Sequence, residues 1–283
     1  MTPPIAGPSS RGRRPGPMVR TRVHELGTEG ERRHEDRLAT EEPLEIRLAW
    51  PDAAPRRVWV TMRTPGHDFE LAAGWLVHEG LAGSGDIGTV AYCTDVDLSP
   101  EQEFNVVTVT LDAPPAADPG HRHTTQATGS SACGVCGKDS IDAALTVSPA
   151  GRWSGPLPEP DVVRRLPDLL RERQAVFSKT GGVHAAGLFD ADGALLVVRE
   201  DVGRHNAVDK VTGARVLAGD PPAAACLVVS GRAGFELVQK AAAVGVGALV
   251  SVGAPTSLSV ELARKSGLAL YGFASATRCV RYT

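Results

Sequence analysis

The sequence predicts an α/β protein (α+β overall), with a mixed sheet and flanking helices in its second half and a smaller N-terminal α+β part. Two observations predict this class. From residue 160 to the C-terminus, short hydrophobic runs alternate with longer helical stretches, a pattern typical of βαβ crossovers in a largely parallel or mixed sheet. Before residue 113, strand-like runs surround a single helical stretch without that alternation.

The chain of 283 residues is long enough for two modest domains. Residues 1–24 contain five Arg and no acidic residue among many Pro, Gly and Ser, a composition that cannot bury enough apolar surface to fold. We therefore expect a disordered tail over 1–42 and an N-terminal α+β domain over 43–150. An α/β domain over 151–283 would follow, because a Pro- and Gly-rich stretch separates the two halves near residues 150–160.

The elements follow in order from residue 43. Runs 44–50 and 57–63 flank a Pro-Asp-Ala-Ala-Pro turn and predict a hairpin. Apolar residues at helical spacing then predict a helix over 67–80. Segments 89–98 and 103–112 predict two further strands, and a long loop follows over 113–137. In the second half, helices are expected near 160–175, 205–217, 235–245 and 257–267, and strands near 182–189, 194–200, 224–230, 248–253 and 268–273.

Composition excludes several classes of protein. A net charge of −3 and a pI near 6.2 leave no basic footprint for nucleic acid. The sequence has no run of 18 consecutive apolar residues, so no membrane-spanning helix is predicted. No secretory signal is recognisable. The five cysteines are odd in number and sparse, unlike a disulfide framework. We therefore expect a cytoplasmic protein that contacts neither nucleic acid nor membrane.

The strongest chemical motif is a C-G-V-C pair, Cys133 and Cys136, at the far end of the long loop. Two thiols at this spacing can share a metal, form a disulfide or cooperate in passing sulfur. Lys138 and a helix expected over 139–145 would lower the thiol pKa and favour the nucleophilic thiolate.

Other interpretations of this pair stay open. His121 and His123 would complete a Cys₂His₂ zinc site, but not in the usual finger order. A zinc deaminase needs H-x-E upstream of its cysteines, whereas His184 follows them and has no Glu two residues on. A thioredoxin-like pair would directly follow a strand, which is missing here, and two incidental cysteines are the remaining interpretation.

Further candidates lie where strands meet helices in the second half. Open α/β sheets bind phosphorylated ligands at such junctions. Each junction alone is explained by an ordinary turn or by self-paired charges, but several together predict one wide anion-binding pocket. Neither a P-loop nor G-x-G-x-x-G is present. The candidate residues at these junctions are Arg204, His205, Ser230, Arg232, Thr256 and Ser257. His184 is a further candidate at a strand start, where the preceding Gly181-Gly182 pair permits close approach of a ligand, and a β-turn with a packed histidine is the alternative interpretation.

Seven motifs together resemble the formate dehydrogenase accessory sulfurtransferase family (FdhD). They run in order from residue 43 to residue 263, and only residues 1–42 fall outside the resemblance. The motifs are PLEIRL, TMRTPGHDFELAAGWL, SACGVCGK, TGGVHAA, REDVGRHNAVDK, SGRAGFELVQK and GAPTSLSVELA.

The resemblance implies a sulfurtransferase that accepts sulfur from a cysteine desulfurase as a persulfide on Cys133, with Cys136 as its partner. It implies delivery of that sulfur to the molybdenum cofactor, in its bis(guanine dinucleotide) form, before insertion into the formate dehydrogenase catalytic subunit. The implied fold is similar to cytidine deaminases. The family's cofactor-binding segment corresponds to Phe273, Ala274, Ser275, Ala276, Thr277 and Arg278, with Ala274 standing where the family commonly has a basic residue.

On this interpretation the cofactor is a bound substrate and no structural metal is expected. For an open sheet of this size we expect a homodimer. The alternative is a zinc-stabilised cofactor-binding chaperone without sulfur chemistry.

Overall fold

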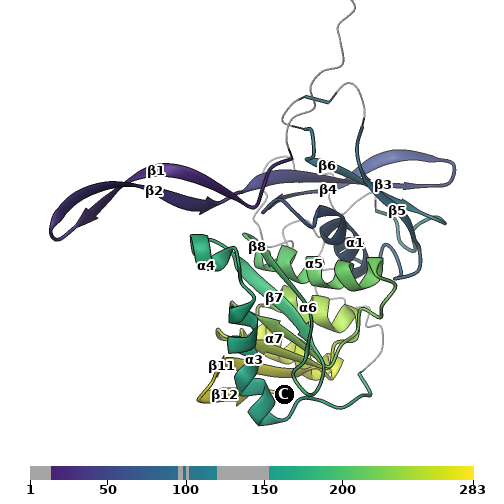
Figure 1. Ribbon diagram of the computed structural model, residues 1–283. Helices are drawn as coiled ribbons and strands as arrows, with labels where there is room; N and C mark the ends of the chain where they lie inside the picture. The colour runs from purple at the N-terminus through teal and green to yellow at the C-terminus, as the bar shows by residue number, and fades with distance from the viewer. Residues whose placement is uncertain (1–13, 95–97, 100–101, 120–152) are drawn as a thin grey trace, which may run out of the picture.

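The computed structural model describes residues 14–94, 98–99, 102–119 and 153–283. Its mixed α+β architecture confirms the predicted class. Figure 1 shows two lobes, one built on each of two sheets, and a long hairpin that extends away from both. None of the helices in the described ranges is long and apolar enough to cross a membrane.

The N-terminal lobe is a four-stranded sheet in the order β4-β3-β6-β5. The predicted hairpin is present as an antiparallel pair, and β3 pairs in parallel with β6 on its other side. Helix α1 packs its buried face, including Leu71 and Trp75, on this sheet. The elements are β3 (Glu42–Trp50), β4 (Ala53–Arg63), α1 (Asp68–His78), β5 (Ile87–Tyr92) and β6 (Val106–Leu111).

The C-terminal lobe is a six-stranded mixed sheet in the order β12-β11-β10-β9-β7-β8. Strands β9, β10 and β11 are parallel, and β7 runs against both β9 and β8. As a result β8, β9, β10 and β11 end at the same edge of the sheet, where β7 begins; we call this the carboxyl edge. The strands are β7 (His184–Phe189), β8 (Leu195–Asp201), β9 (Cys226–Val229), β10 (Ala248–Ser251), β11 (Ala269–Ser275) and β12 (Arg278–Arg281).

Helices cover both faces of this sheet because alternate strand residues point to opposite sides. Leu227 and Leu249 face a core shared with α5, α6 and α7. Val228 and Val250 face α3 on the other side. The helices are α3 (Pro160–Glu172), the short α4 (Phe177–Thr180), α5 (Arg204–Leu217), α6 (Phe235–Ala243) and α7 (Ser257–Ser266). Neither α4 nor β12 was expected from the sequence.

The two lobes meet where α1 crosses α5, and glycine makes this crossing close (Figure 1). A Cβ atom on Gly74 would lie 1.9 Å from the carbonyl oxygen of Asp209, and one on Gly213 would lie 1.8 Å from that of Glu70. No side chain fits at either position, so the helix backbones touch directly.

The expectation of a disordered tail over 1–42 is wrong for residues 18–39. Strands β1 (Met18–Gly27) and β2 (Gly30–Ala39) form an antiparallel hairpin. Its strands are joined across the ladder by charge pairs, including Arg20 with Glu35 at 3.0 Å and Arg32 with Glu25 at 2.8 Å. Residues 1–13, and the expected domain boundary at residue 150, lie outside the described residues.

Candidate functional site

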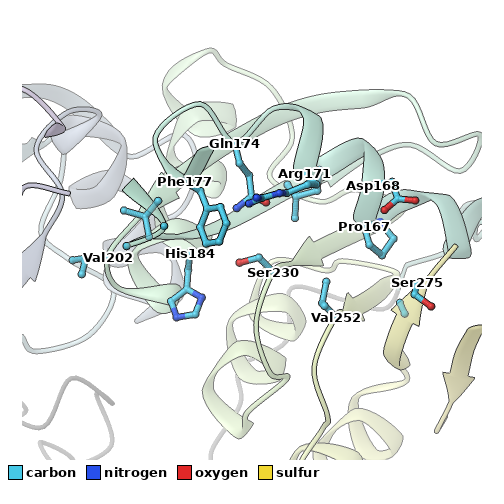
Figure 2. Close-up of a pocket in the computed structure, with 15 residues that line it drawn as sticks. Pro167, Asp168, Arg171, Gln174, Phe177, His184, Val202, Ser230, Val252 and Ser275 are labelled. Carbon is cyan, nitrogen blue, oxygen red and sulfur yellow. The ribbon is translucent and has the colours of Figure 1, made fainter. Parts of the chain in front are cut away.

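A cavity of about 690 Å³ lies between α3, α4 and the carboxyl edge of the six-stranded sheet. Figure 2 shows side chains from both walls converging on this space. The position agrees with the rule that open α/β sheets bind ligands outside the carboxyl ends of their strands. The lining residues are Pro167, Asp168, Leu170, Arg171, Gln174, Phe177, Gly181, Gly182, Val183, His184, Val202, Ser230, Val252, Ala274 and Ser275.

Four residues singled out from the sequence line this cavity together. His184 begins β7, Ser230 follows β9, and Ala274 and Ser275 end β11. The Ser230 hydroxyl accepts a hydrogen bond from the backbone N–H of Ala185 at 2.9 Å, which fixes its position beside β7. Segments far apart in the sequence therefore contribute polar groups to one wall.

A basic cluster adjoins His184. Burial lowers the pKa of His184, and the charges of Arg204, His205 and Arg232 lower it further. This imidazole is therefore neutral at neutral pH, and an anion bound beside it would reverse the effect of the cations. His205 contacts Glu236, Nε2 to Oε2, at 2.7 Å. The junction residues expected to meet an anion thus surround one histidine.

Two polar atoms in this region have no hydrogen-bond partner among the described residues. The Arg204 Nε and the Gln174 Nε2 atoms are both buried, and Gln174 as a whole is 4% exposed. Buried donors of this kind are normally paired. A bound ligand with acceptor oxygens or ring nitrogens would supply the missing partners.

Nine predicted residues do not line the cavity: Arg204, His205 and Arg232 of the basic cluster, Phe273 and Arg278, and four whose positions have a local structural explanation. The Thr256 hydroxyl caps α7 by accepting from the Ser259 N–H, and Ser257 is the first residue of that helix. Ala276 and Thr277 form the turn between β11 and β12. Thr256 is therefore explained by helix capping, and the turn residues by the β11–β12 hairpin.

Phe273 and Arg278 also lie outside the lining residues but form an unusual surface. Phe273 has a positive φ of 50°, which is strained for an aromatic residue. Its backbone N–H donates to the Gly253 carbonyl at 3.1 Å, and its side chain is 41% exposed. The Arg278 guanidinium lies 5.3 Å from the ring centroid. The strained backbone thus presents an aromatic face at the carboxyl edge.

Sequence reasoning missed the wall that α3 and α4 contribute. Arg171 stacks on Phe177 with 4.0 Å between the guanidinium carbon and the ring centroid, and Asp168 and Gln174 lie on the same wall (Figure 2). The pattern of α3 predicts an ordinary amphipathic helix, and no motif distinguishes its polar residues.

The motif REDVGRHNAVDK, residues 199–210, is rich in charged side chains and serves two purposes. Arg204 and His205 lie in the basic cluster, but Asp201 and Lys210 are buried where the lobes meet. Lys210 Nζ lies 2.6 Å from Asp201 Oδ2 and donates to the Thr64 carbonyl at 2.8 Å. This part of the motif holds the lobes together.

Cys133, Cys136, Lys138, His121 and His123 lie outside the described residues, as does the helix expected over 139–145. Within the described part of the chain, Cys226 and Cys279 are free thiols, and the Cys93 sulfur accepts a hydrogen bond from Arg47 Nη1 at 3.7 Å. Burial raises the pKa of the Cys226 thiol well above its usual value. The described ranges hold no cluster of three or more His, Cys, Asp or Glu suited to a metal ion.

Comparisons with known proteins agree with the resemblance. The FdhD/NarQ family model matches residues 39–283. The sulfur carrier protein FdhD of Streptomyces avermitilis is 46% identical over 245 residues, with 84% of each chain covered. That of Mycobacterium tuberculosis is 46% identical over 258 residues, which cover 89% of this chain and 91% of the relative.

The fold also matches a solved structure. The crystal structure of a candidate formate dehydrogenase accessory protein from Desulfotalea psychrophila aligns with a TM-score of 0.71 at 23% identity. The alignment covers 94% of this chain and 97% of that one. Taken with the family match over most of its length and relatives well above 40% identity, these findings show that the chain belongs to the FdhD/NarQ family.

Proposed function

We propose that this protein carries sulfur from a cysteine desulfurase, as a persulfide on Cys133, to the molybdenum cofactor before its insertion into the formate dehydrogenase catalytic subunit. The observation that carries the proposal is the open cavity beside a basic cluster at the carboxyl edge. It supports a large, anionic substrate. The relatives named as sulfur carriers support the chemistry.

The transfer balances with the two cysteines and an external reductant. The Cys133 thiolate attacks the outer sulfur of the donor's persulfide, forms Cys133–S–SH and releases the donor thiolate. The Cys136 thiolate then attacks the Cys133 Sγ, which forms a disulfide and expels hydrosulfide toward the cofactor. The two electrons that reduce the carried sulfur come from the two thiols, and a dithiol reductant restores the pair.

The described residues suit the bis(guanine dinucleotide) form of the cofactor. Arg204 and Arg232 would meet its phosphates, since guanidinium groups match phosphate geometry. The side chains of Arg171 and Gln174 offer hydrogen-bond donors to a guanine. The exposed Phe273 ring offers it a stacking surface. These contacts require no protein-bound metal, and the reaction takes place in the cytoplasm on our proposal.

Persulfide labelling tests this function. Incubation with a cysteine desulfurase and cysteine is expected to add about 32 Da, one sulfur atom, to the peptide that contains Cys133, and a reductant should remove it. Cys133→Ser should abolish the label. Cys136→Ser should keep the label but lose repeated turnover. Stoichiometric zinc in a protein that takes up no sulfur would contradict the proposal and favour a cofactor-binding chaperone.

A further inference from the structure

Helix α4 is the shortest of the described helices, and it forms part of the cavity wall. It has four residues, Phe177–Thr180, and makes a single turn. One turn has little stability of its own, because helix nucleation fixes several residues for very few hydrogen bonds. The position of α4 must therefore come from contacts with the rest of the fold. The cavity depends on that position, since Phe177, Gly181, Gly182 and Val183 all belong to its lining.

A carboxylate on β8 holds the start of α4. The Glu200 Oε2 atom accepts a hydrogen bond from the Val176 N–H at 2.8 Å, and Oε1 accepts one from the Phe177 N–H at 2.8 Å. The first N–H groups of a helix have no acceptor within the helix, so this side chain supplies what the short turn lacks. Hydrogen bonds to an ionised acceptor are also stronger than those between neutral groups. Both oxygens of Glu200 are thus used on two consecutive backbone donors.

The hold of Glu200 extends along α4 into the site. The Phe177 ring stacks on the Arg171 guanidinium at 4.0 Å, so fixing the Phe177 backbone also fixes this pair (Figure 2). At the end of the turn, the Gly181 N–H donates to the Phe177 carbonyl at 2.8 Å. Three residues later the chain reaches His184, the first residue of β7. The start of α4 therefore sets the geometry of much of this wall.

The neighbours of Glu200 on β8 point the other way. Side chains alternate between the two faces of a strand, so Arg199 and Asp201 face the N-terminal lobe and α5. Arg199 Nη2 donates to the Glu70 carboxylate of α1 at 2.7 Å, and Asp201 pairs with Lys210 of α5 at 2.6 Å. Three consecutive charged residues thus connect β8 to the contact between the lobes on one face and to the cavity wall on the other.

We propose that Glu200 is a positioning residue for substrate binding. Its carboxylate holds α4 so that the Phe177–Arg171 pair and the start of β7 keep the geometry that binds the nucleotide end of the cofactor. Glu200 lies outside the residues that line the cavity, so it acts through α4 and does not touch the substrate. The inference rests on the proposed function, because it requires that the cavity bind a nucleotide.

Two substitutions of Glu200 test this role. Glu200→Ala removes both acceptors, whereas Glu200→Gln keeps one acceptor oxygen and turns an amide donor toward the second N–H. We expect the affinity for guanosine diphosphate, measured by calorimetry, to fall roughly tenfold in Glu200→Ala and about threefold in Glu200→Gln. Glu172→Ala removes the same charge from an exposed position at the end of α3, outside the lining residues, and is the matched control. It should bind the nucleotide like the wild type.

Two further measurements separate positioning from a general loss of stability. Hydrogen exchange at the Val176 and Phe177 amides should accelerate about tenfold in Glu200→Ala, while the amides of α5 stay as protected as in the wild type. In the double variant E200A/F177A, the loss of affinity should be smaller than the product of the two single losses, because Glu200 acts through Phe177.

Several results would overturn the inference. Wild-type affinity in Glu200→Ala would do so, as would an equal loss in Glu172→Ala or unchanged exchange at the start of α4. Single losses that multiply in the double variant would show that Glu200 does not act through Phe177. A wild-type protein that binds no nucleotide would contradict the proposed substrate and this role of Glu200 together, and persulfide labelling of Cys133 would then test the sulfur chemistry by itself.

Discussion

The Asp201 carboxylate where the lobes meet and the cavity at the carboxyl edge both gather polar and charged side chains, but only the Asp201 carboxylate has both oxygens hydrogen-bonded within the fold. At the contact, one Asp201 oxygen accepts from the Gly203 N–H and from Asn206, and the other accepts from the Thr64 N–H and pairs with Lys210. By contrast, Gln174 Nε2 in the cavity wall and Arg204 Nε in the adjoining basic cluster are buried and without partners among the described residues.

Within the motif 199–210, this difference distinguishes a charged side chain that stabilises the fold from one that is available to bind a ligand. Asp201 and Arg204 lie three residues apart, yet Asp201 is fully buried within a complete hydrogen-bond network and Arg204 is not. Buried polar groups that lack partners cost free energy. A protein that retains them therefore gains from a ligand that pairs them, and the predictions below test this contrast from the largest effect to the smallest.

Gly74→Ala is expected to cause the largest loss of stability. Its Cβ would overlap the backbone of α5 at 1.9 Å, so the two helices would have to separate. We expect a loss of more than about 4 kcal/mol in the free energy of unfolding, measured by urea denaturation. Gly231→Ala beside His184 is the control, because its Cβ would lie 3.4 Å from the His184 ring, an ordinary contact. Equal stability of the two variants would contradict this account of the crossing.

Lys210→Met is expected to cost about 3 kcal/mol, because it leaves the Asp201 carboxylate buried without its counter-charge. The double variant Asp201→Asn with Lys210→Met should recover part of the loss. Lys265→Met is the matched control. It removes an exposed pair with Glu261, in which the side chains are 71% and 59% exposed, and should change stability by less than about 1 kcal/mol. A Lys210 variant as stable as the control would show that the contact between the lobes does not depend on this pair.

The sequence predicts the regular elements better than it predicts the hairpin. Apolar periodicity is a local property, and it places α1 and, apart from α4, the helices and strands from α3 to β11 close to their observed bounds. The hairpin over 18–39 has little apolar patterning, and it is held by a backbone ladder that pairs distant residues, with exposed cross-strand pairs such as Arg20 with Glu35, fifteen residues apart, beside it. Composition alone predicts disorder for this segment, because composition holds no information on which residues pair across two strands.

The cavity shows a second limit of the sequence. Strand-to-helix junctions predict that Arg204 and Ser230 share an edge, because parallel strands end together. His184 reaches the same edge because it begins β7, which runs antiparallel to β9. The opposing wall depends on where α3 packs, so Gln174 meets residues of β11 that are about a hundred positions away. Burial also decides which charges of the motif 199–210 remain available. The packing position of α3 and the burial of each charge depend on the tertiary structure, and a local sequence pattern predicts neither.

Gln174→Leu tests the cavity side of the comparison and has the smallest expected effect on stability. The change removes a buried donor that has no partner among the described residues, so the free energy of unfolding should stay within about 1 kcal/mol of the wild type or rise. Binding of guanosine diphosphate, measured by calorimetry as a probe for the nucleotide end of the proposed substrate, should weaken about tenfold. Gln239→Leu on α6, outside the lining residues, is the control for binding.

Stability and binding must respond differently to this change for the contrast to hold. A Gln174→Leu protein that loses more than about 2 kcal/mol would place this side chain with the structural network around Asp201. One that binds the nucleotide as tightly as the wild type would remove Gln174 from the binding surface. Unchanged stability with weakened binding is expected of a group whose hydrogen-bond partner is supplied by the ligand and not by the fold.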